Sequence, residues 1–202
     1  ADGTNLQTLV ASGYDPAWSP DGQKIAYMSD GNLHILDFQV GDTTLKVSPL
    51  PGWYPTPAWS PDGRELVFAA NTLSPGPAGL LRENPIQILQ IDANGNNLQT
   101  LIAPGYDPAW SPDGQKIAYM ESDGIHVFDF QSHNNTTLPV PVPIPGYFNY
   151  PSWSPDGRQL VFSSTAAFGN STQILQVNAD GTNLQTLAAS GFSPAWSPCF
   201  AY

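Results

Sequence analysis

The chain has 202 residues, enough for one sizeable domain, and a formal net charge of −11 from 6 Lys and Arg against 17 Asp and Glu. This acidic balance argues against a nucleic-acid partner and against an anionic membrane surface, because both carry negative charge. No apolar run approaches the ~18 residues that a membrane span needs, and the first residues show no signal-peptide pattern. Because the sequence starts at Ala1, without Met and inside a repeat, we interpret it as a processed or excerpted product.

One seven-residue motif organises the sequence. Residues 16–22 read Pro-Ala-Trp-Ser-Pro-Asp-Gly, and the motif returns at 57–63, 108–114 and 151–157 and, cut short, at 194–198. Ser-Pro-Asp-Gly is typical of a type I turn, with Pro second, Asp third and Gly fourth. β-rich runs such as Lys-Ile-Ala-Tyr-Met follow the turn. The motif Trp residues recur at roughly 41 to 51 residues, which is close to the length of one four-stranded propeller blade.

In chain order, the motif predicts four complete blades, at about 16–50, 57–103, 108–143 and 151–190. Each blade has an inner, a second, a third and an outer strand. The expected strands are 16–19, 24–29, 33–38 and 43–47; then 57–60, 65–70, 86–91 and 97–102; then 108–111, 116–121, 125–130 and 136–142; then 151–154, 159–164, 172–177 and 183–188. A long connection, 71–85, interrupts the second blade.

The two chain ends predict a further, incomplete blade. Residues 1–9 recur unchanged at 179–187, where they form an outer strand, so 1–12 and 194–202 together supply a partial fifth blade. The fold class is therefore an all-β propeller of four complete blades plus a composite fifth. Closure within one chain would remove strand edges, whereas pairing between chains would join subunits. The residues expected at this closure or assembly contact are Leu6, Leu9, Trp196, Cys199 and Tyr202.

The blades alternate in sequence. Gly13 to Met28 is identical to Gly105 to Met120, whereas the even blades share Leu-Val-Phe and Gln-Ile-Leu-Gln. The repeat is thus a two-blade unit. Cys199 is the single cysteine, so an internal disulfide is excluded. We expect a free thiol there, with an intermolecular disulfide or lipid attachment as alternatives.

The repeat resembles that of the TolB-type β-propellers, also called the WD40-like PD40 repeat. The residues that carry the resemblance are Trp-Ser-Pro-Asp-Gly followed by Lys-Ile-Ala-Tyr, and Asp-Gly-Thr-Asn-Leu-Gln-Thr-Leu, and they cover essentially the whole chain. The resemblance implies a periplasmic or secreted bacterial protein, usually of six blades, used for protein binding or as a gate in front of a peptidase. We therefore expect an extracytoplasmic location.

Two sets of titratable residues have a structural interpretation. Each of Asp21, Asp62, Asp113 and Asp156 lies in a Ser-Pro-Asp-Gly turn, whose backbone its carboxylate can bind. His34 and His126 hold equivalent third-strand positions in separate blades. Because such positions diverge around a ring, we do not expect the two residues to share a metal, and we expect each to have a satisfied structural role.

The connections from each outer strand to the next inner strand are the candidate ligand site. They share one propeller face, and they carry Tyr14, Asp15, Trp53, Tyr54, Tyr106, Asp107, Tyr147, Tyr150 and Phe192. Aromatic rings beside small polar groups suit a saccharide or a peptide, but the same rings also suit packing between blades. Asp15 and Asp107 are equivalent residues that could hold a cation or water in the central channel. No other cofactor is expected.

Three functions remain open at this stage. The first is a non-enzymatic extracytoplasmic scaffold or binding module that takes a protein, peptide or glycan on the aromatic face. The second is a self-assembling subunit joined through its incomplete blade, and the third is a propeller-type lyase or hydrolase. No nucleophile elbow, zinc-protease helix or phosphate loop occurs, so no enzyme is expected. Glycosylation sequons occur at Asn134, Asn135 and Asn170.

Overall fold

The computed structural model describes residues 6–45, 47, 56–71, 73–75, 81–140, 146–166 and 172–196. These residues form four sheets of four antiparallel strands, in which strands that follow one another in the blade lie side by side. We number the sheets blades one to four. The strands are β1 (Tyr14–Trp18), β2 (Lys24–Ser29), β3 (Asn32–Asp37) and β4 (Gly41–Leu45); β5 (Ala58–Trp59), β6 (Glu65–Ala70), β9 (Gln87–Asp92) and β10 (Gln99–Ile102); β11 (Tyr106–Trp110), β12 (Lys116–Glu121), β13 (Gly124–Asp129) and β14 (Asn134–Thr137); β15 (Gly146–Trp153), β16 (Gln159–Ala166), β17 (Thr172–Asn178) and β18 (Gln185–Ala188).

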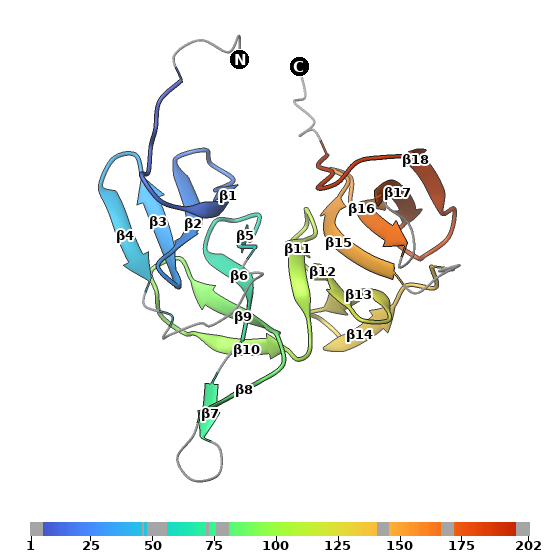
Figure 1. Cartoon of the computed structure of the whole chain (residues 1–202), viewed down its shortest axis with the longest axis horizontal. Helices are drawn as coiled ribbons and strands as arrows, with labels where there is room; N and C mark the ends of the chain where they lie inside the picture. The colour runs from blue at the N-terminus through green and yellow to red at the C-terminus, as the bar shows by residue number, and fades with distance from the viewer. Residues whose placement is uncertain are drawn as a thin grey trace.

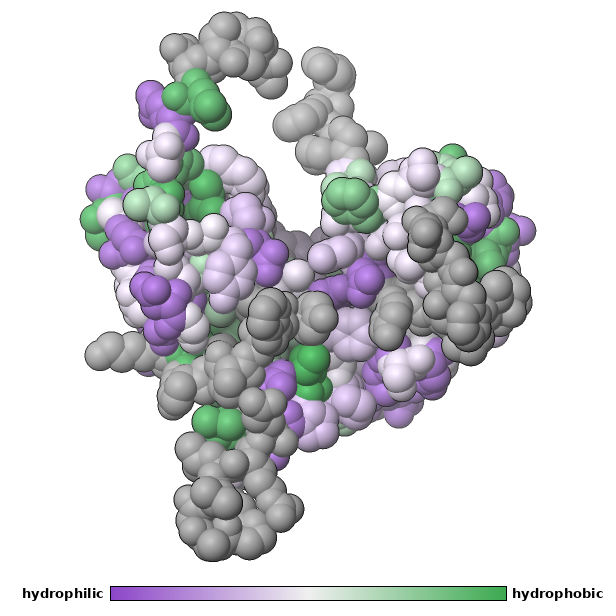
Figure 2. Space-filling model, viewed as in Figure 1, coloured by the Kyte–Doolittle hydropathy of each residue, from purple (hydrophilic) through white to green (hydrophobic). Residues whose placement is uncertain are grey.

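The blades follow one another along an arc, from blade one at the blue end of the chain to blade four at the red end (Figure 1). Strand β1 contacts β5, β6 contacts β11, and β11 contacts β15, so each blade touches the next. The arc is open between blades one and four. Figure 2 shows the same opening as a hollow in the surface.

The motif turn forms because the serine and the aspartate bind each other and the backbone. Ser19 Oγ donates to Asp21 Oδ1 at 2.6 Å, and the Lys24 amide donates to Ser19 Oγ at 2.9 Å. The Gly22 amide closes the turn on the Ser19 carbonyl at 2.9 Å, with a φ of 67° at Gly22 that favours glycine. The same bonds recur in the other three complete motifs. The predicted structural role of the four motif aspartates is confirmed.

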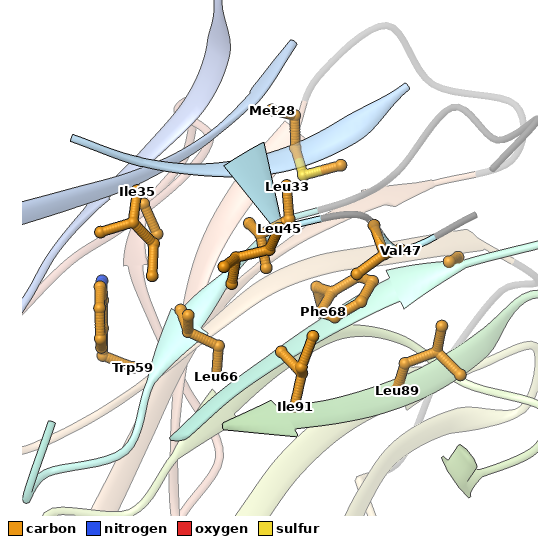
Figure 3. Packing of buried hydrophobic residues seen from close by; sticks show 12 residues of the cluster. Met28, Leu33, Ile35, Leu45, Val47, Trp59, Leu66, Phe68, Leu89 and Ile91 are labelled. Atoms are coloured by element: carbon orange, nitrogen blue, oxygen red, sulfur yellow. The ribbon is translucent and has the colours of Figure 1, made fainter. Parts of the chain in front are cut away.

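The core lies between the blades, on the alternating faces of the strands. Met28, Leu33 and Leu45 of blade one pack against Leu66 and Phe68 of blade two (Figure 3). The repeat-equivalent residues of blades three and four build a second core of the same kind. A different core joins blades two and three, with Val67 and Ile88 on one side and Tyr119 on the other. The array therefore contains two kinds of blade interface, as a two-blade repeat requires.

The structure differs from the sequence expectation in one connection and in one outer strand. The segment 71–85 contains a short hairpin of its own, β7 (Leu73–Pro75) paired with β8 (Leu81–Glu83). The outer strand of blade three was expected at 136–142, but β14 ends at Thr137. The buried Leu138 still donates its amide to the Ile125 carbonyl at 2.9 Å, whereas Pro139 lacks the amide that would extend the ladder, and 141–142 lie outside the described residues.

The predicted fifth blade is not formed by the described residues. Residues 6–12 and 194–196 contain no strand, and Leu6 and Leu9 are 98% and 52% exposed. Residues 1–5 and 197–202, including Cys199 and Tyr202, lie outside the described residues. Among the residues that the structure describes, no helix is long and apolar enough to cross a membrane.

Candidate functional site

The inner strands of blades one, three and four, and the equivalent segment after β18, share an irregular backbone at the residue before the motif proline. Asp15, Asp107, Tyr150 and Ser193 hold this position, and their φ values are 49°, 49°, 57° and 50°. The strand register shifts at this point in blades one, three and four. A left-handed conformation at a non-glycine residue costs on the order of 1 kcal/mol or more, and it persists only where neighbours hold it in place. The same distortion therefore marks one ring of positions around the array.

Contacts with both neighbouring blades hold Asp107 in this ring. Thr56 of blade two donates its hydroxyl to Asp107 Oδ1 at 3.2 Å, and the Tyr150 amide of blade four donates to Asp107 Oδ2 at 3.1 Å. The residue is only 4% exposed. Burial raises the pKa of the Asp107 carboxyl, although the two hydrogen bonds oppose this effect. Asp107 thus joins three blades at one point.

Asp15 is the equivalent residue of blade one, and it is half-buried. Burial raises its pKa as well, and its charge adds to the upward shift of the Asp107 pKa. The structure therefore brings the two carboxyls into one electrostatic neighbourhood. Among the described residues, no cation is paired with either carboxylate.

The predicted aromatic residues have different environments. Tyr14, Tyr150 and Phe192 are 47%, 40% and 78% exposed, so each contributes aromatic surface to this face. Tyr106 instead packs partly buried, and its hydroxyl donates to the Glu121 carbonyl at 3.2 Å. The prediction of a packing role thus holds for this one tyrosine. Trp53, Tyr54 and the side chain of Tyr147 lie outside the described residues, although the Tyr147 backbone belongs to β15.

Other predicted sites have simpler environments. Asn134 and Asn135 are exposed on the outer strand β14, and Asn170 lies outside the described residues. Trp196 is half-buried against blade four, and its amide lies 3.5 Å from Ser152 Oγ. Trp196 is the repeat equivalent of Trp110.

A cluster of possible metal ligands lies on the β12–β13 hairpin. Glu121, Asp123 and His126 each offer a ligand atom within 4.8 Å of the others. Asp123 Oδ1 is 2.7 Å from His126 Nε2, and Thr137 Oγ1 is 3.3 Å from the other ring nitrogen, Nδ1. Sequence reasoning placed His126 correctly on the third strand of blade three, where it pairs with Tyr119, but missed its two acidic neighbours. The missed signal was the local departure from the repeat, since blade one has Ser29 and Gly31 at these positions.

A groove of about 360 Å³ lies between the motif turns of blades two and three. Its aromatic wall is the stacked pair Trp110 and Phe130, with ring centres 5.1 Å apart. Glu65 and Gln90 line it from blade two and hydrogen-bond each other at 2.9 Å. This groove lies at the opposite end of the strands from the aromatic connections.

The sequence matches no family model and no curated protein. Solved structures nevertheless share the architecture. TolB from Acinetobacter baumannii is 21% identical, with a TM-score of 0.74 over 96% of this chain and 48% of that one. The fold is that of a TolB-like β-propeller. A putative TolB from Agrobacterium tumefaciens is 19% identical, with a TM-score of 0.52 over 93% of this chain and 86% of that one.

The same TolB-like fold occurs in an enzyme. Oligogalacturonate lyase from Vibrio parahaemolyticus is 14% identical, with a TM-score of 0.63 over 86% of this chain and 52% of that one. The present chain spans about half the length of the Acinetobacter TolB and of this lyase. At these identities the likeness concerns the fold, and a propeller fold hosts both binding and catalysis.

Proposed function

We propose that this TolB-like propeller is a non-enzymatic, extracytoplasmic binding module whose aromatic connections receive a protein, peptide or glycan. The observation that carries the proposal is the exposure of Tyr14, Tyr150 and Phe192 at or beside the ring positions that also hold Asp15 and Asp107. Flat rings cover the apolar faces of a sugar or a peptide side chain, and carboxylates accept hydrogen bonds from hydroxyl or amide groups. The extracytoplasmic location rests on the resemblance of the repeats to TolB-type propellers.

A pair of equally exposed aromatics tests this proposal. Tyr14 and Phe38 are both 47% exposed, but Phe38 follows β3 at the opposite end of the strands. Tryptophan fluorescence should be followed during titration with panels of oligosaccharides and of peptides. Tyr14→Ala should weaken the binding of the active ligand about tenfold, which corresponds to ~1.4 kcal/mol, and Phe38→Ala should leave it unchanged. Equal loss in both variants, or no response to any ligand, would count against this face.

Self-assembly is the second candidate, and a comparison of repeat-equivalent residues favours it. In blade three, Trp110 and Phe130 pack against the core shared with blade two. In blade one, the equivalent Trp18 and Phe38 also stack on each other, but they are 59% and 47% exposed. Blade one thus presents the aromatic edge that an even blade covers elsewhere in the same molecule.

The other end of the array carries the complementary half of that interface. Val161, Ile174 and Leu187 of blade four are equivalent to Val67, Ile88 and Leu101, which pack against blade three. Leu187 is 52% exposed. In this candidate function, residues 1–12 and 194–202 complete a fifth blade, within one chain or between neighbouring chains. Light scattering over a wide concentration range distinguishes closure within one chain from pairing between chains, since closure within a chain keeps the mass near 21.7 kDa.

An enzymatic role is the third candidate, and the bonding of Asp107 speaks against it. Both carboxylate oxygens already accept hydrogen bonds from neighbouring blades, which suits a structural anchor better than a proton-transfer group. Incubation with oligogalacturonate gives a direct test. Product formation that disappears in Asp15→Asn or Asp107→Asn would overturn the non-enzymatic proposal.

A further inference from the structure

We propose that Glu121, Asp123 and His126 form a binding site for one divalent transition-metal ion, of which Zn²⁺ is the representative. One imidazole nitrogen and two carboxylates are a ligand set that suits such an ion, with the remaining positions left to water. The ligand atoms already lie within 4.8 Å of one another. Ligands around zinc at ~2.0–2.2 Å from the ion are somewhat closer to each other than this, so a small movement of side chains completes the site.

The histidine is rigid, whereas one carboxylate is free to adjust. The His126 side chain is 9% exposed and contacts the Tyr119 ring, with ring centres 5.4 Å apart. Asp123, by contrast, lies in the hairpin turn with its side chain 65% exposed. Nε2 of His126 faces this carboxylate at 2.7 Å, so an ion that both atoms bind replaces their direct contact.

Hydrogen bonds from outside the cluster orient two of the three ligands. Thr137 Oγ1, on the neighbouring strand β14, lies 3.3 Å from His126 Nδ1 and so leaves Nε2 for the ion. The Tyr119 hydroxyl donates to Glu121 Oε1 at 3.2 Å, and the Tyr106 hydroxyl holds the Glu121 carbonyl at the same distance. Such supporting contacts are typical of sites that position a metal ligand.

The internal repeat gives an independent reason to regard the cluster as a site. The sixteen residues Gly13 to Met28 recur unchanged as Gly105 to Met120, and His34 recurs as His126. All five positions between these identical parts differ: Ser29 and Gly31 are replaced by Glu121 and Asp123, and Asp30 is replaced by Ser122. The sequence therefore diverges in the hairpin that precedes the retained histidine, where it places two carboxylates.

Blade one shows the same histidine without this set. His34 Nδ1 lies 3.4 Å from Asp42 and 3.3 Å from Thr44. Its Nε2 is buried, and it has no hydrogen-bond partner among the described residues. A single carboxylate on the other ring nitrogen does not make a chelating site. Blade one is therefore a matched control within the same molecule.

Isothermal titration of the whole chain with Zn²⁺ tests the proposal. The wild type should bind one ion with saturable heat, and the transition temperature should rise with Zn²⁺ concentration. Glu121→Gln, Asp123→Asn and His126→Gln should each weaken binding at least tenfold and reduce the thermal shift, whereas His34→Gln should retain both. Ca²⁺ should not replace Zn²⁺, because an imidazole ligand disfavours it.

Two results would overturn the site. One is the absence of saturable Zn²⁺ binding to the wild type up to 1 mM, a concentration far above the dissociation constant expected for a specific site of this kind. The other is unchanged affinity in Glu121→Gln and Asp123→Asn, with circular dichroism showing that both variants are folded. These two variants preserve side-chain volume at partly or largely exposed positions, so they report on the site even if the buried His126→Gln does not fold.

Discussion

At the residue scale, buried hydroxyls and carboxyls decide how the repeat closes its turns and joins its blades. Ser19, Ser60, Ser111 and Ser154 are each no more than 5% exposed, and each accepts a backbone amide that lies in the first strand after its turn. The neighbouring aspartates have lowered pKa values because the serine hydroxyl donates to them. Asp107, also buried, shifts in the opposite direction because burial outweighs its hydrogen bonds.

Removing one turn serine should destabilise the protein. In Ser111→Ala the Lys116 amide loses the acceptor that it now has at 2.9 Å, and the Asp113 carboxylate loses its hydroxyl donor. We expect a loss of about 1 to 2 kcal/mol in the free energy of unfolding, measured by urea denaturation. Ser132→Ala is the control, because Ser132 is exposed and its amide can still bind Asp129 at 2.9 Å. A loss below the error of the measurement would mean that water replaces the hydroxyl.

The raised pKa of Asp107 predicts a pH-dependent gain in Asp107→Asn. As pH rises above ~3.9, the usual pKa of an aspartate, the unfolded chain ionises before the folded one, so the wild type loses stability until the folded pKa is passed. The variant does not ionise there. The stability difference, variant minus wild type, should therefore increase from pH 3 to pH 7 in denaturation curves.

Asp113→Asn provides the opposite sign as a control. The folded pKa of Asp113 is lowered, so ionisation stabilises the folded wild type as pH rises toward the unfolded pKa. The difference between this variant and the wild type should decrease over the same pH range. Parallel curves for the two variants would contradict the assignment of both shifts.

At the element scale, the strand order of every blade could be predicted from the sequence, whereas the start of the inner strands could not. The motif fixes β2 at Lys24–Ser29 and β12 at Lys116–Glu121, as the sequence predicts, because β-rich residues follow an unmistakable turn. The bulge at Asp15 and Asp107 was not foreseen, since a residue before proline ordinarily avoids helical conformations. At Asp107, contacts from other blades, which no local pattern encodes, hold the bulge in place.

The same limit applies to the candidate site. The repeat predicted that His126 would stand on the third strand, but only the hairpin geometry brings Glu121 and Asp123 to it. Likewise, the repeat identified Tyr14 and Tyr106 as equivalent aromatics, and the structure separates them into an exposed ring and a packed one. Burial depends on which blade is the neighbour, and this property belongs to the assembled array and not to the repeat.

Equivalent tryptophans should accordingly differ in their contribution to stability. Trp110 stacks on Phe130 and packs between blades two and three, whereas Trp18 is 59% exposed at the open end. Trp110→Ala should lower the free energy of unfolding by about 2 to 3 kcal/mol, somewhat less than for a fully buried aromatic. In dilute solution Trp18→Ala should change it by less than about 0.5 kcal/mol. A large effect of Trp18→Ala that grows with protein concentration would instead indicate that another subunit covers this edge.

At the scale of the whole molecule, two kinds of interface alternate along an open arc (Figure 1). Blade one ends the array with the aromatic half of the interface that joins blades two and three, and blade four ends it with the aliphatic half of that interface. Stability in such a repeat array is approximately the sum of unit and interface contributions, so each uncovered end lacks one interface. The arc therefore has complementary ends.

A chain lengthened by one more two-blade unit tests this complementarity. A copy of residues 99–184 inserted after residue 184 adds one odd and one even blade in the correct order, because Leu184 is equivalent to Leu98. We expect the longer chain to melt at a higher temperature than the natural one, because it gains two interfaces and leaves the same two ends. Scanning calorimetry gives the comparison. A chain lengthened only by a copy of residues 151–193, inserted after residue 193, should melt lower than the longer one, since an even blade would then follow an even blade.

The contacts of Asp107 with the blades before and after its own also affect how the gene for such a repeat can change in length. Its carboxylate needs a hydroxyl from the even blade before it and an amide from the even blade after it. Recombination between misaligned repeats can add or remove any number of blades, but a product that differs by a single blade leaves this buried acid beside the wrong neighbour. Tandem duplications that survive in descendants of this gene should therefore span the interval from Trp18 to Trp110, or multiples of it.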